Sequence, residues 1–529
     1  MKNKLLVFKV LILIMAMVSC EKDYNQWEVD SSTDRLFKSI IFEASAVKST
    51  SVELKFTKSI SATKYVFEFS KDSLEFKNIV KSVEVLADTL TPFANSTTLT
   101  KVEYREIFDE LDGTTGYSVR MKSVDEITGL ESKYSQVYFE TPAEDIFKGY
   151  LATSTTAILK WAISPRVTNI SLYDETSVLI KNIVLTPEQK AVGMLTIDNL
   201  TNGTNYVAKI FNVDNNRGTL NFKTTGLLNS TIYKVLLTDT AGSIGSALKD
   251  LVATGATDIT VEFASGTAYT IGGDITIPTG VNNIAFVGSV DQNGYPSMLN
   301  NVRFKVQDKI NNIVLQNLVT SSASSFLIDL PAKTVNDIQI EGCYITQLNS
   351  IVRASGLSVI NNIYVNDCRI SQTGGYGMLN VGAGGTVSSI NVTNSTLTEI
   401  STRFADVRVK TKINFKNITC VNVTMGMGHL WNFDNNNPVQ LSIQNCIIAG
   451  PNGGIALNST SGTYSNIPIS YSGNYKTKDI INGTRLLTGI SDIPLNIADF
   501  FVDPTNGDYH IKPGIGFAGT GVAGDPRWF

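Results

Sequence analysis

Asn312-Ile-Val-Leu-Gln-Asn317 is a short phrase that returns throughout the C-terminal half of this chain. It reappears as Asp337-Ile-Gln-Ile-Glu-Gly342 and as Asn362-Ile-Tyr-Val-Asn-Asp367. Four further copies fit the same template: Asn283-Ile-Ala-Phe-Val-Gly288, Ser389-Ile-Asn-Val-Thr-Asn394, Lys412-Ile-Asn-Phe-Lys-Asn417 and Gln440-Leu-Ser-Ile-Gln-Asn445. Successive copies are 23 to 29 residues apart, so the phrase is a structural repeat.

Each copy of the phrase carries the signals of one strand and one corner. Its apolar residues alternate, which indicates a strand with one buried face. It closes on Asn, Gly or Asp, which tolerate a left-handed backbone. One strand and one left-handed corner per repeat predict a parallel β-helix in which the closing Asn side chains form a hydrogen-bonded ladder. The alternative is a β-sandwich with irregular hairpins, which gives strands about every 8–12 residues but no corner at a longer fixed period.

The residue after each corner is small to medium in size, as an inward-facing stack requires. These residues are Leu318, Cys343, Cys368, Ser395, Ile418 and Cys446. No cysteine pair has zinc-type spacing. Cys343 and Cys368 occupy equivalent places in adjacent coils, so a disulfide between them is an alternative. We interpret them as buried thiols, because stacked positions aim side chains alongside one another.

Size and charge narrow the function classes. The chain has 529 residues, of which 43% are hydrophobic and 17% charged, and these values suit about three domains with a large core. The formal net charge of −4 makes a nucleic-acid partner a poor fit.

The N-terminus has the layout of a secretion signal. Lys2 and Lys4 precede an apolar run from Leu5 to Val18, which is too short to span a membrane. Met17-Val-Ser-Cys20 resembles a bacterial lipobox, with Met17 in place of the usual Leu, and the resemblance implies lipidation of Cys20. Glu21-Lys-Asp23 resembles the export signal of surface lipoproteins in Bacteroidota. The alternative is a plain secreted protein with an incidental cysteine.

Two segments between the signal and the repeats alternate like antiparallel sandwiches and match each other. Leu54-Lys-Phe56 corresponds to Leu159-Lys-Trp161, and Leu111 through Tyr117 corresponds to Leu200 through Tyr206. A Leu followed six residues later by a strand-opening Tyr resembles fibronectin type III domains, where the Tyr caps the corner between sheets. The resemblance implies spacer or interaction modules.

Both ends of the repeat region carry recognisable segments. Ser243–Val252 is an amphipathic helix signal, suited to covering the open end of a β-helix. Val502–Ile511 and Gly514–Gly524 resemble the closing coil of secreted pectate-lyase-like β-helices. The whole layout resembles surface lipoproteins of polysaccharide-utilisation loci.

We therefore predict an all-β chain: two fibronectin type III-like sandwiches followed by a right-handed parallel β-helix with a short N-terminal capping helix. The expected domains are a signal peptide at 1–19, a lipidated tether at 20–34, sandwiches at 35–143 and 144–226, and the β-helix at 227–529.

The strand before each phrase is the expected binding face, because pectate-lyase-like proteins usually bind extended polysaccharide there. One or two polar residues per coil would form a line along this face, about 4.8 Å apart. The line consists of Asp329, Arg353, Asn380, Asp406, Arg408, Asn432 and Asp434. Arginine forks suit the carboxylates of an acidic sugar chain. Tyr376 or Trp431 could stack on a sugar ring, with His429 nearby. The alternative is a solvated ladder of ion pairs without a ligand.

A polysaccharide lyase on the same scaffold is the enzymatic alternative. Arg353 or Arg408 would be the base, and Asp329, Asp406 and Asp434 would be ligands of Ca²⁺. The Arg-x-Pro-x-x-Arg motif of pectate lyases is absent, since Arg403 through Arg408 has Ala405 in place of Pro. No pair of acids stands beside His429 or His510 as a polygalacturonase-type hydrolase would require.

The sequence thus predicts a lipid-anchored, cell-surface glycan-binding protein of the outer membrane that serves a polysaccharide uptake complex, with a pectin-like acidic polymer as ligand. The alternatives are the lyase, with Ca²⁺ as its cofactor, and a structural or adhesive surface protein.

The lipobox reading gives the first prediction. Cys20→Ala should release the protein from membranes, because no acyl group can then be attached. Fractionation of cells followed by immunoblotting measures this, and a Ser19→Ala variant, which keeps the cysteine, is the control. An unchanged membrane fraction for Cys20→Ala would contradict the lipoprotein hypothesis.

Overall fold

The computed structural model describes residues 35–93, 102–164, 166–291, 293–321, 326–400, 403–422, 431–434, 439–450, 457–459, 469–480 and 489–529, with residues 431–434, 457–459 and 469 described by their backbone only. The structure is 55% strand and 6% helix by residue, so the expected all-β class is confirmed. Cys20 and the rest of the expected signal and tether lie outside the described residues. Among the described residues no helix is long and apolar enough to cross a membrane.

The first sandwich consists of two antiparallel sheets. One has the order β1-β2-β5 and the other the order β4-β3-β6, with β7 and β8 both paired to β6. Its strands are β1 (Phe42–Val47), β2 (Val52–Thr57), β3 (Lys64–Ser70), β4 (Ile79–Leu86), β5 (Glu103–Phe108), β6 (Gly116–Asp125), β7 (Leu130–Glu131) and β8 (Ser135–Glu140). An aromatic core built around Phe56, Phe67 and Tyr65 joins the sheets.

The second sandwich repeats this plan, with sheet orders β9-β10-β13 and β12-β11-β14-β15. Its elements are β9 (Phe147–Ala152), β10 (Ala157–Trp161), β11 (Asn169–Asp174), β12 (Leu179–Val184), α2 (Pro187–Val192), β13 (Met194–Ile197), β14 (Asn205–Asn212) and β15 (Asn215–Lys223). Both sandwiches are fibronectin type III-like.

The two matched tyrosines close a corner in each sandwich, as the sequence predicts. The hydroxyl of Tyr117 accepts a hydrogen bond from the amide of Asp112 at 3.0 Å. The hydroxyl of Tyr206 accepts one from the amide of Thr201 at 2.9 Å. Each tyrosine therefore pins its strand to the segment five residues upstream while its ring stays buried.

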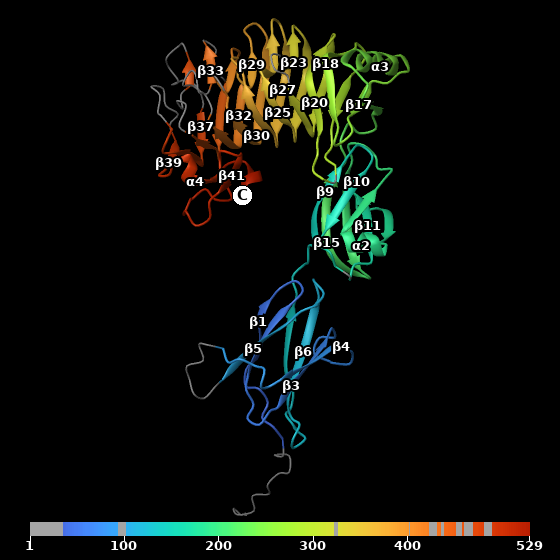
Figure 1. Ribbon diagram of the computed structural model, residues 1–529, viewed down its shortest axis with the longest axis vertical. Helices are drawn as coiled ribbons and strands as arrows, with labels where there is room; N and C mark the ends of the chain where they lie inside the picture. Colours follow the sequence, from blue (N-terminus) through green and yellow to red (C-terminus); the bar gives the residue numbers. More distant parts are fainter. Residues whose placement is uncertain are drawn as a thin grey trace, which may run out of the picture. The chain divides into compact units, whose positions relative to one another are not determined.

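The rest of the chain winds into a β-solenoid of about 8 turns (Figure 1). Its strands pair in parallel with the equivalent strands of the next coil, which forms three long sheets. The first sheet contains β18 (Ala268–Ile277), β20 (Ser297–Val306), β23 (Phe326–Pro331), β26 (Ser350–Ser355), β29 (Leu379–Val381), β31 (Ala405–Val407), β33 (Trp431–Asp434) and β36 (Leu457–Ser459).

The repeated phrases form the second sheet, and the residues after the corner form the third. The second sheet contains β16 (Thr231–Lys234), β17 (Asp258–Glu262), β19 (Asn283–Val287), β21 (Lys309–Gln316), β24 (Thr334–Glu341), β27 (Val359–Asn366), β30 (Thr386–Thr398), β32 (Lys412–Val421), β34 (Gln440–Gln444) and β37 (Ile469–Ser472). The third contains the first residues of β18 and β20, the later halves of β30 and β32, and β22 (Leu318–Ser321), β25 (Tyr344–Leu348), β28 (Arg369–Thr373), β35 (Ile447–Ala449), β38 (Asn474–Thr477) and β39 (Ile490–Ile493).

The expected asparagine ladder stands at the corner between the second and third sheets. Asn394, Asn417 and Asn445 have φ values of 48°, 57° and 53°. Nδ2 of Asn417 donates to Oδ1 of Asn394 at 2.8 Å, and Nδ2 of Asn445 donates to Oδ1 of Asn417 at 3.3 Å. Each coil is therefore locked to the next at the point where its backbone is least favourable.

Two further corners also use left-handed residues, and the sequence pattern does not reveal them. Gln347, Gln372, Glu399 and Asn422 have φ values between 51° and 55° at the far end of the third sheet. Ala332, Gly356 and Gly384 have φ values of 54°, 64° and 94° between the first and second sheets.

A continuous apolar core fills the β-helix, and the four cysteines Cys343, Cys368, Cys420 and Cys446 belong to it as buried free thiols. Burial raises the pKa of Cys446 to about 12 and the pKa values of Cys368 and Cys420 well above the ordinary value, so these thiols stay protonated. The interpretation as buried thiols is confirmed.

The expected capping helix is also present, as α3 (Ala241–Ala253). Thr240 caps it by accepting from the amide of Ser243, and Ile244 and Leu248 pack into the first coil. The prediction of this helix is therefore confirmed.

The C-terminal segment packs against the outer face of the third sheet. It comprises α4 (Ile497–Phe500), β40 (Phe501–Asp503), β41 (Asp508–Ile511) and η2 (Pro526–Trp528). Its Phe500, Phe501 and Tyr509 pack on Val421, Ile447 and Ala449 of the third sheet. These three sheet residues alternate with interior residues, so the segment covers an outer face.

The ladder gives a stability prediction. Asn394→Leu should lower the free energy of unfolding of the β-helix by about 2–4 kcal/mol, because a left-handed Leu is strained and Asn417 loses its acceptor. Urea unfolding of the β-helix measures this. Gln339→Leu, an exposed position of β24, is the matched control and should be near neutral. Equal effects of both substitutions would contradict the role of the ladder.

Candidate functional site

The first sheet brings one polar residue per coil into a single row. The parallel register pairs each member with the next, in the order Lys305, Asp329, Arg353, Asn380, Asp406, Asn432 and Asn458. We call these residues the polar row. Five of them, Asp329, Arg353, Asn380, Asp406 and Asn432, are residues that the sequence placed in a line, at about 4.8 Å per coil.

Strand alternation explains why the polar row faces outward. The neighbours of Asp329 are Ile328 and Leu330, and those of Arg353 are Val352 and Ala354, all buried in the core. Because successive strand residues point to opposite faces, an apolar residue on each side holds the polar side chain on the outer face.

Arg353 is the member of the row that aromatic rings hold. Its guanidinium carbon lies 4.6 Å from the ring centroid of Phe326 and 6.0 Å from that of Tyr376. The two rings meet edge to face with centroids 5.4 Å apart, and Tyr376 is 44% exposed. Among the described residues Arg353 has no ion-pair partner. The guanidinium is therefore positioned by cation–π contacts and keeps its donors for another group.

The acidic members of the face are already paired with arginines. Asp406 receives Nε and Nη2 of Arg408 at 3.1 and 3.2 Å and Nη1 of Arg403 at 3.0 Å, and its side chain is only 4% exposed. Nη1 of Arg303 lies 3.8 Å from Oδ2 of Asp329. These contacts match the ladder of ion pairs that was the alternative to a ligand site.

At the first coils the same pairing continues. Asp274 receives Nε and Nη2 of Arg303 at 2.6 and 2.9 Å, and Nζ of Lys305 lies 2.7 Å away. The hydrogen bond from Arg303 holds the pKa of Asp274 below its ordinary value, and Lys305 adds to this effect.

The geometry argues against Arg408 as the base of a lyase and against a calcium site built from Asp329 and Asp406. Arg408 already holds a carboxylate through two hydrogen bonds, so it is badly placed to accept a proton from a sugar. Asp329 and Asp406 are three coils apart, roughly 14 Å, whereas calcium ligands lie about 2.3–2.6 Å from the ion. Within the described ranges no three His, Cys, Asp or Glu residues gather in a way that could hold a metal.

Some of the predicted site residues, or their side chains, lie outside the described part of the chain. His429 lies outside the described residues, as do the side chains of Trp431, Asn432 and Asp434. The backbone of β33 pairs Trp431 with Ala405, one position before the polar row. A register shift after Asn432 takes Asp434 out of the row as well. Arg408 follows the end of β31 and pairs with Asp406 of the row.

The sequence reasoning missed Phe326, Lys305 and Arg303. Phe326 belongs to a strand that was read for its polar members only. Arg303-Phe-Lys305 has the same alternation as the later strands, so extending the pattern one coil upstream would have found both basic residues.

Two of the solved structures that resemble this chain consist of fibronectin type III domains. No protein-family model matches the sequence, and no curated protein matches it significantly. A two-domain fibronectin type III segment from chicken tenascin is 15% identical with a TM-score of 0.22, covering 35% of this chain and 99% of its own. The FN1–FN3 domains of chicken CNTN1 are 11% identical with a TM-score of 0.14, covering 36% of this chain and 68% of their own.

The pairing of Asp274 predicts a pH dependence. Its folded-state pKa is depressed, so its contribution to stability is present above the unfolded pKa and is lost as the pH falls through the folded pKa. Asp274→Asn should therefore reduce the loss of β-helix stability between neutral pH and pH of about 3.

Calorimetry of the β-helix transition across this range measures the effect. Asp308→Asn is the control, since that exposed carboxylate has no ion-pair partner among the described residues. A pH profile of Asp274→Asn that overlays the profile of the unsubstituted protein would contradict the prediction.

Proposed function

We propose that this protein binds an extended acidic polysaccharide along the polar row of the first sheet. The observation that carries the proposal is Arg353, a guanidinium held by Phe326 and Tyr376 without an ion-pair partner among the described residues. A planar guanidinium can hold a sugar carboxylate through two parallel hydrogen bonds.

The surroundings of Arg353 suit the remainder of a sugar unit. The exposed ring of Tyr376 offers an apolar face against which a pyranose can pack. Asn380 is the next member of the row and supplies an amide, which can both donate to and accept from hydroxyls. The regular spacing of about 4.8 Å per coil lets successive side chains contact successive parts of one chain.

A structural or adhesive protein is the competing function, and the paired acids of this face favour it. Asp274, Asp329 and Asp406 each have an arginine partner, so these carboxylates are paired without a ligand. Arg353 distinguishes the two functions. In a purely structural ladder of ion pairs, this arginine would also have an acidic partner.

The proposal includes a cellular location for the protein. The Met17–Cys20 motif and the acidic-basic residues after it support a lipid anchor at the outer membrane and exposure at the cell surface. A β-helix held there by a tether and two sandwiches would present polymer to an outer-membrane glycan transporter. A long polymer that contacts several coils at once would be held more tightly through avidity.

Retention of polygalacturonate tests this function. Arg353→Gln should weaken retention roughly tenfold, since a charge-assisted hydrogen bond contributes about 1.5–3 kcal/mol. Tyr376→Ala should weaken it several-fold through loss of ring packing. Affinity electrophoresis of the chain from residue 21 onward, in gels with and without the polymer, measures both effects.

Tyr364→Ala is the matched control, because Tyr364 is similarly exposed but lies on β27 of the second sheet. Retention that survives both Arg353→Gln and Tyr376→Ala would rule out this face. Formation of an unsaturated product in parallel incubations would make the protein a lyase.

A further inference from the structure

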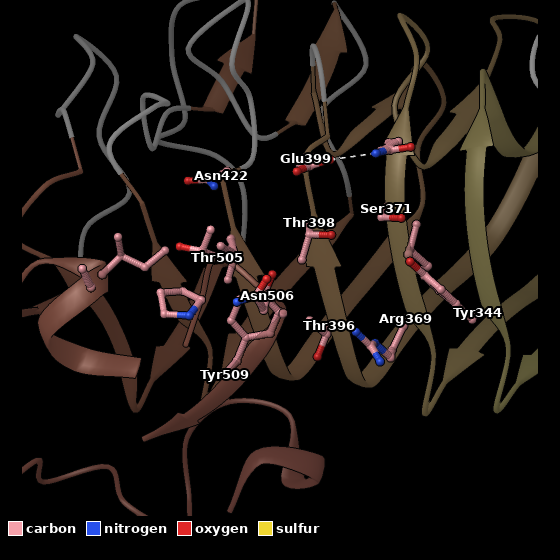
Figure 2. Close-up of a pocket in the computed structure, with 17 residues that line it drawn as sticks. Tyr344, Arg369, Ser371, Thr396, Thr398, Glu399, Asn422, Thr505, Asn506 and Tyr509 are labelled. Atoms are coloured by element: carbon pink, nitrogen blue, oxygen red, sulfur yellow. Dashed lines mark hydrogen bonds between the residues drawn. The ribbon is translucent and has the colours of Figure 1, made fainter. Parts of the chain in front are cut away.

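A cavity lies away from the polar row, between the third sheet and the C-terminal segment. It has a volume of about 600 Å³. Tyr344, Arg369 and Thr396 come from neighbouring strands on one side, and Asn506 and Tyr509 stand opposite (Figure 2).

Buried hydrogen bonds hold the C-terminal side of this cavity in place. Oγ1 of Thr396 donates to Oδ2 of Asp525 at 2.6 Å and accepts from Nε1 of Trp528 at 2.7 Å. The amide of Asp525 donates to Oγ1 of Thr419 at 2.9 Å. The cavity is therefore formed in the folded chain before any ligand arrives.

Arg369 occupies the same chemical situation here as Arg353 does in the polar row. Its guanidinium carbon lies 5.2 Å from the ring centroid of Tyr344 and 5.6 Å from that of Trp528. Within the described part of the chain the guanidinium has no ion-pair or hydrogen-bond partner. The nearby acids are engaged elsewhere: Glu399 accepts from Nε2 of Gln372, and Asp367 pairs with Arg527.

The other groups around the cavity are those that bind hydroxyls. Ser371, Thr398 and Thr505 supply side-chain hydroxyls, and Asn506 supplies an amide. Burial raises the pKa of Tyr509, so its hydroxyl stays protonated at neutral pH. Tyr344, which is 39% exposed, offers an aromatic face. A cation, an aromatic ring and several hydroxyl partners together match a carboxylated sugar better than a bare anion.

The cavity is closed on its C-terminal side. Val421 and Asn422 still line it, but beyond them the outer face of the third sheet is covered, because Phe500 and Phe501 pack in one apolar cluster with Ile447 and Ala449. A polymer running along this sheet could not continue past the C-terminal segment. The site therefore suits the end of a chain and not its interior.

We propose that this cavity binds the terminal unit of an acidic oligosaccharide, with the sugar carboxylate on Arg369. The inference rests on the proposed function for its choice of ligand class, but it uses a different sheet and different residues. It gives the protein an end-binding site in addition to the row that binds along a chain.

Isothermal titration of the chain from residue 21 onward with digalacturonate tests the site. Arg369→Gln should weaken binding at least tenfold. Arg369→Lys keeps the charge but loses the planar guanidinium, so its affinity should lie between those of the unsubstituted protein and Arg369→Gln. Tyr344→Ala should weaken binding several-fold while leaving Arg369 in place. Circular dichroism and thermal melting establish that each variant is folded.

Arg105→Gln is the matched control, because Arg105 also lies over an aromatic ring, 3.7 Å from the centroid of Phe93, but belongs to β5 of the first sandwich. It should leave digalacturonate binding unchanged. Digalacturonate binding that depends on Arg369 would stand even if polymer retention proved independent of Arg353, so the two proposals fail separately.

Three results would overturn the end-binding site. The first is no digalacturonate binding by the unsubstituted protein. The second is equal affinity in Arg369→Gln. The third is binding of acetate or inorganic phosphate as strong as that of digalacturonate, which would make the cavity a simple anion site.

Discussion

The left-handed corner is the constraint on which the β-helix depends. A residue with positive φ costs free energy unless its type tolerates the conformation and its surroundings hold it. At Asn394, Asn417 and Asn445 the amide side chain serves both needs, since it tolerates the backbone and bonds the next coil. Once these corners stack, the register of all three sheets is fixed, and with it every row of side chains on the outer faces.

The sequence predicted those features that depend on the local pattern of residue types. Alternation located the second sheet, and it placed Arg353 beside Asp329 and Asn380. The recurring Asn, Gly or Asp located the ladder corner, and a helical pattern of apolar residues located the capping helix α3. It missed the corner at Gln347 and Gln372 because long side chains are not characteristic of a left-handed backbone. In the structure Nε2 of Gln372 donates to Oε2 of Glu399, the corner residue of the next coil, so a long polar side chain also joins neighbouring coils here.

Tertiary contacts account for the rest of what the sequence could not show. The pairing of Asp406 with Arg403 and Arg408 depends on the segments on either side of β31, and composition cannot distinguish it from a row of available acids. The lateral packing of the C-terminal segment depends on apolar residues at outward positions, Val421, Ile447 and Ala449. In an alternating strand such residues look like additional core, so the pattern does not show that a later segment covers them.

The parallel register also sets how this protein could change in length. Because each coil contributes one rung to the polar row, inserting or deleting a whole repeat lengthens or shortens that face by a single step of about 4.8 Å and leaves the remaining register intact. A change of any other size must be absorbed in a loop. The reach of the surface is thus adjustable only in discrete increments, and gene-level duplication of a repeat is the natural unit of its evolution.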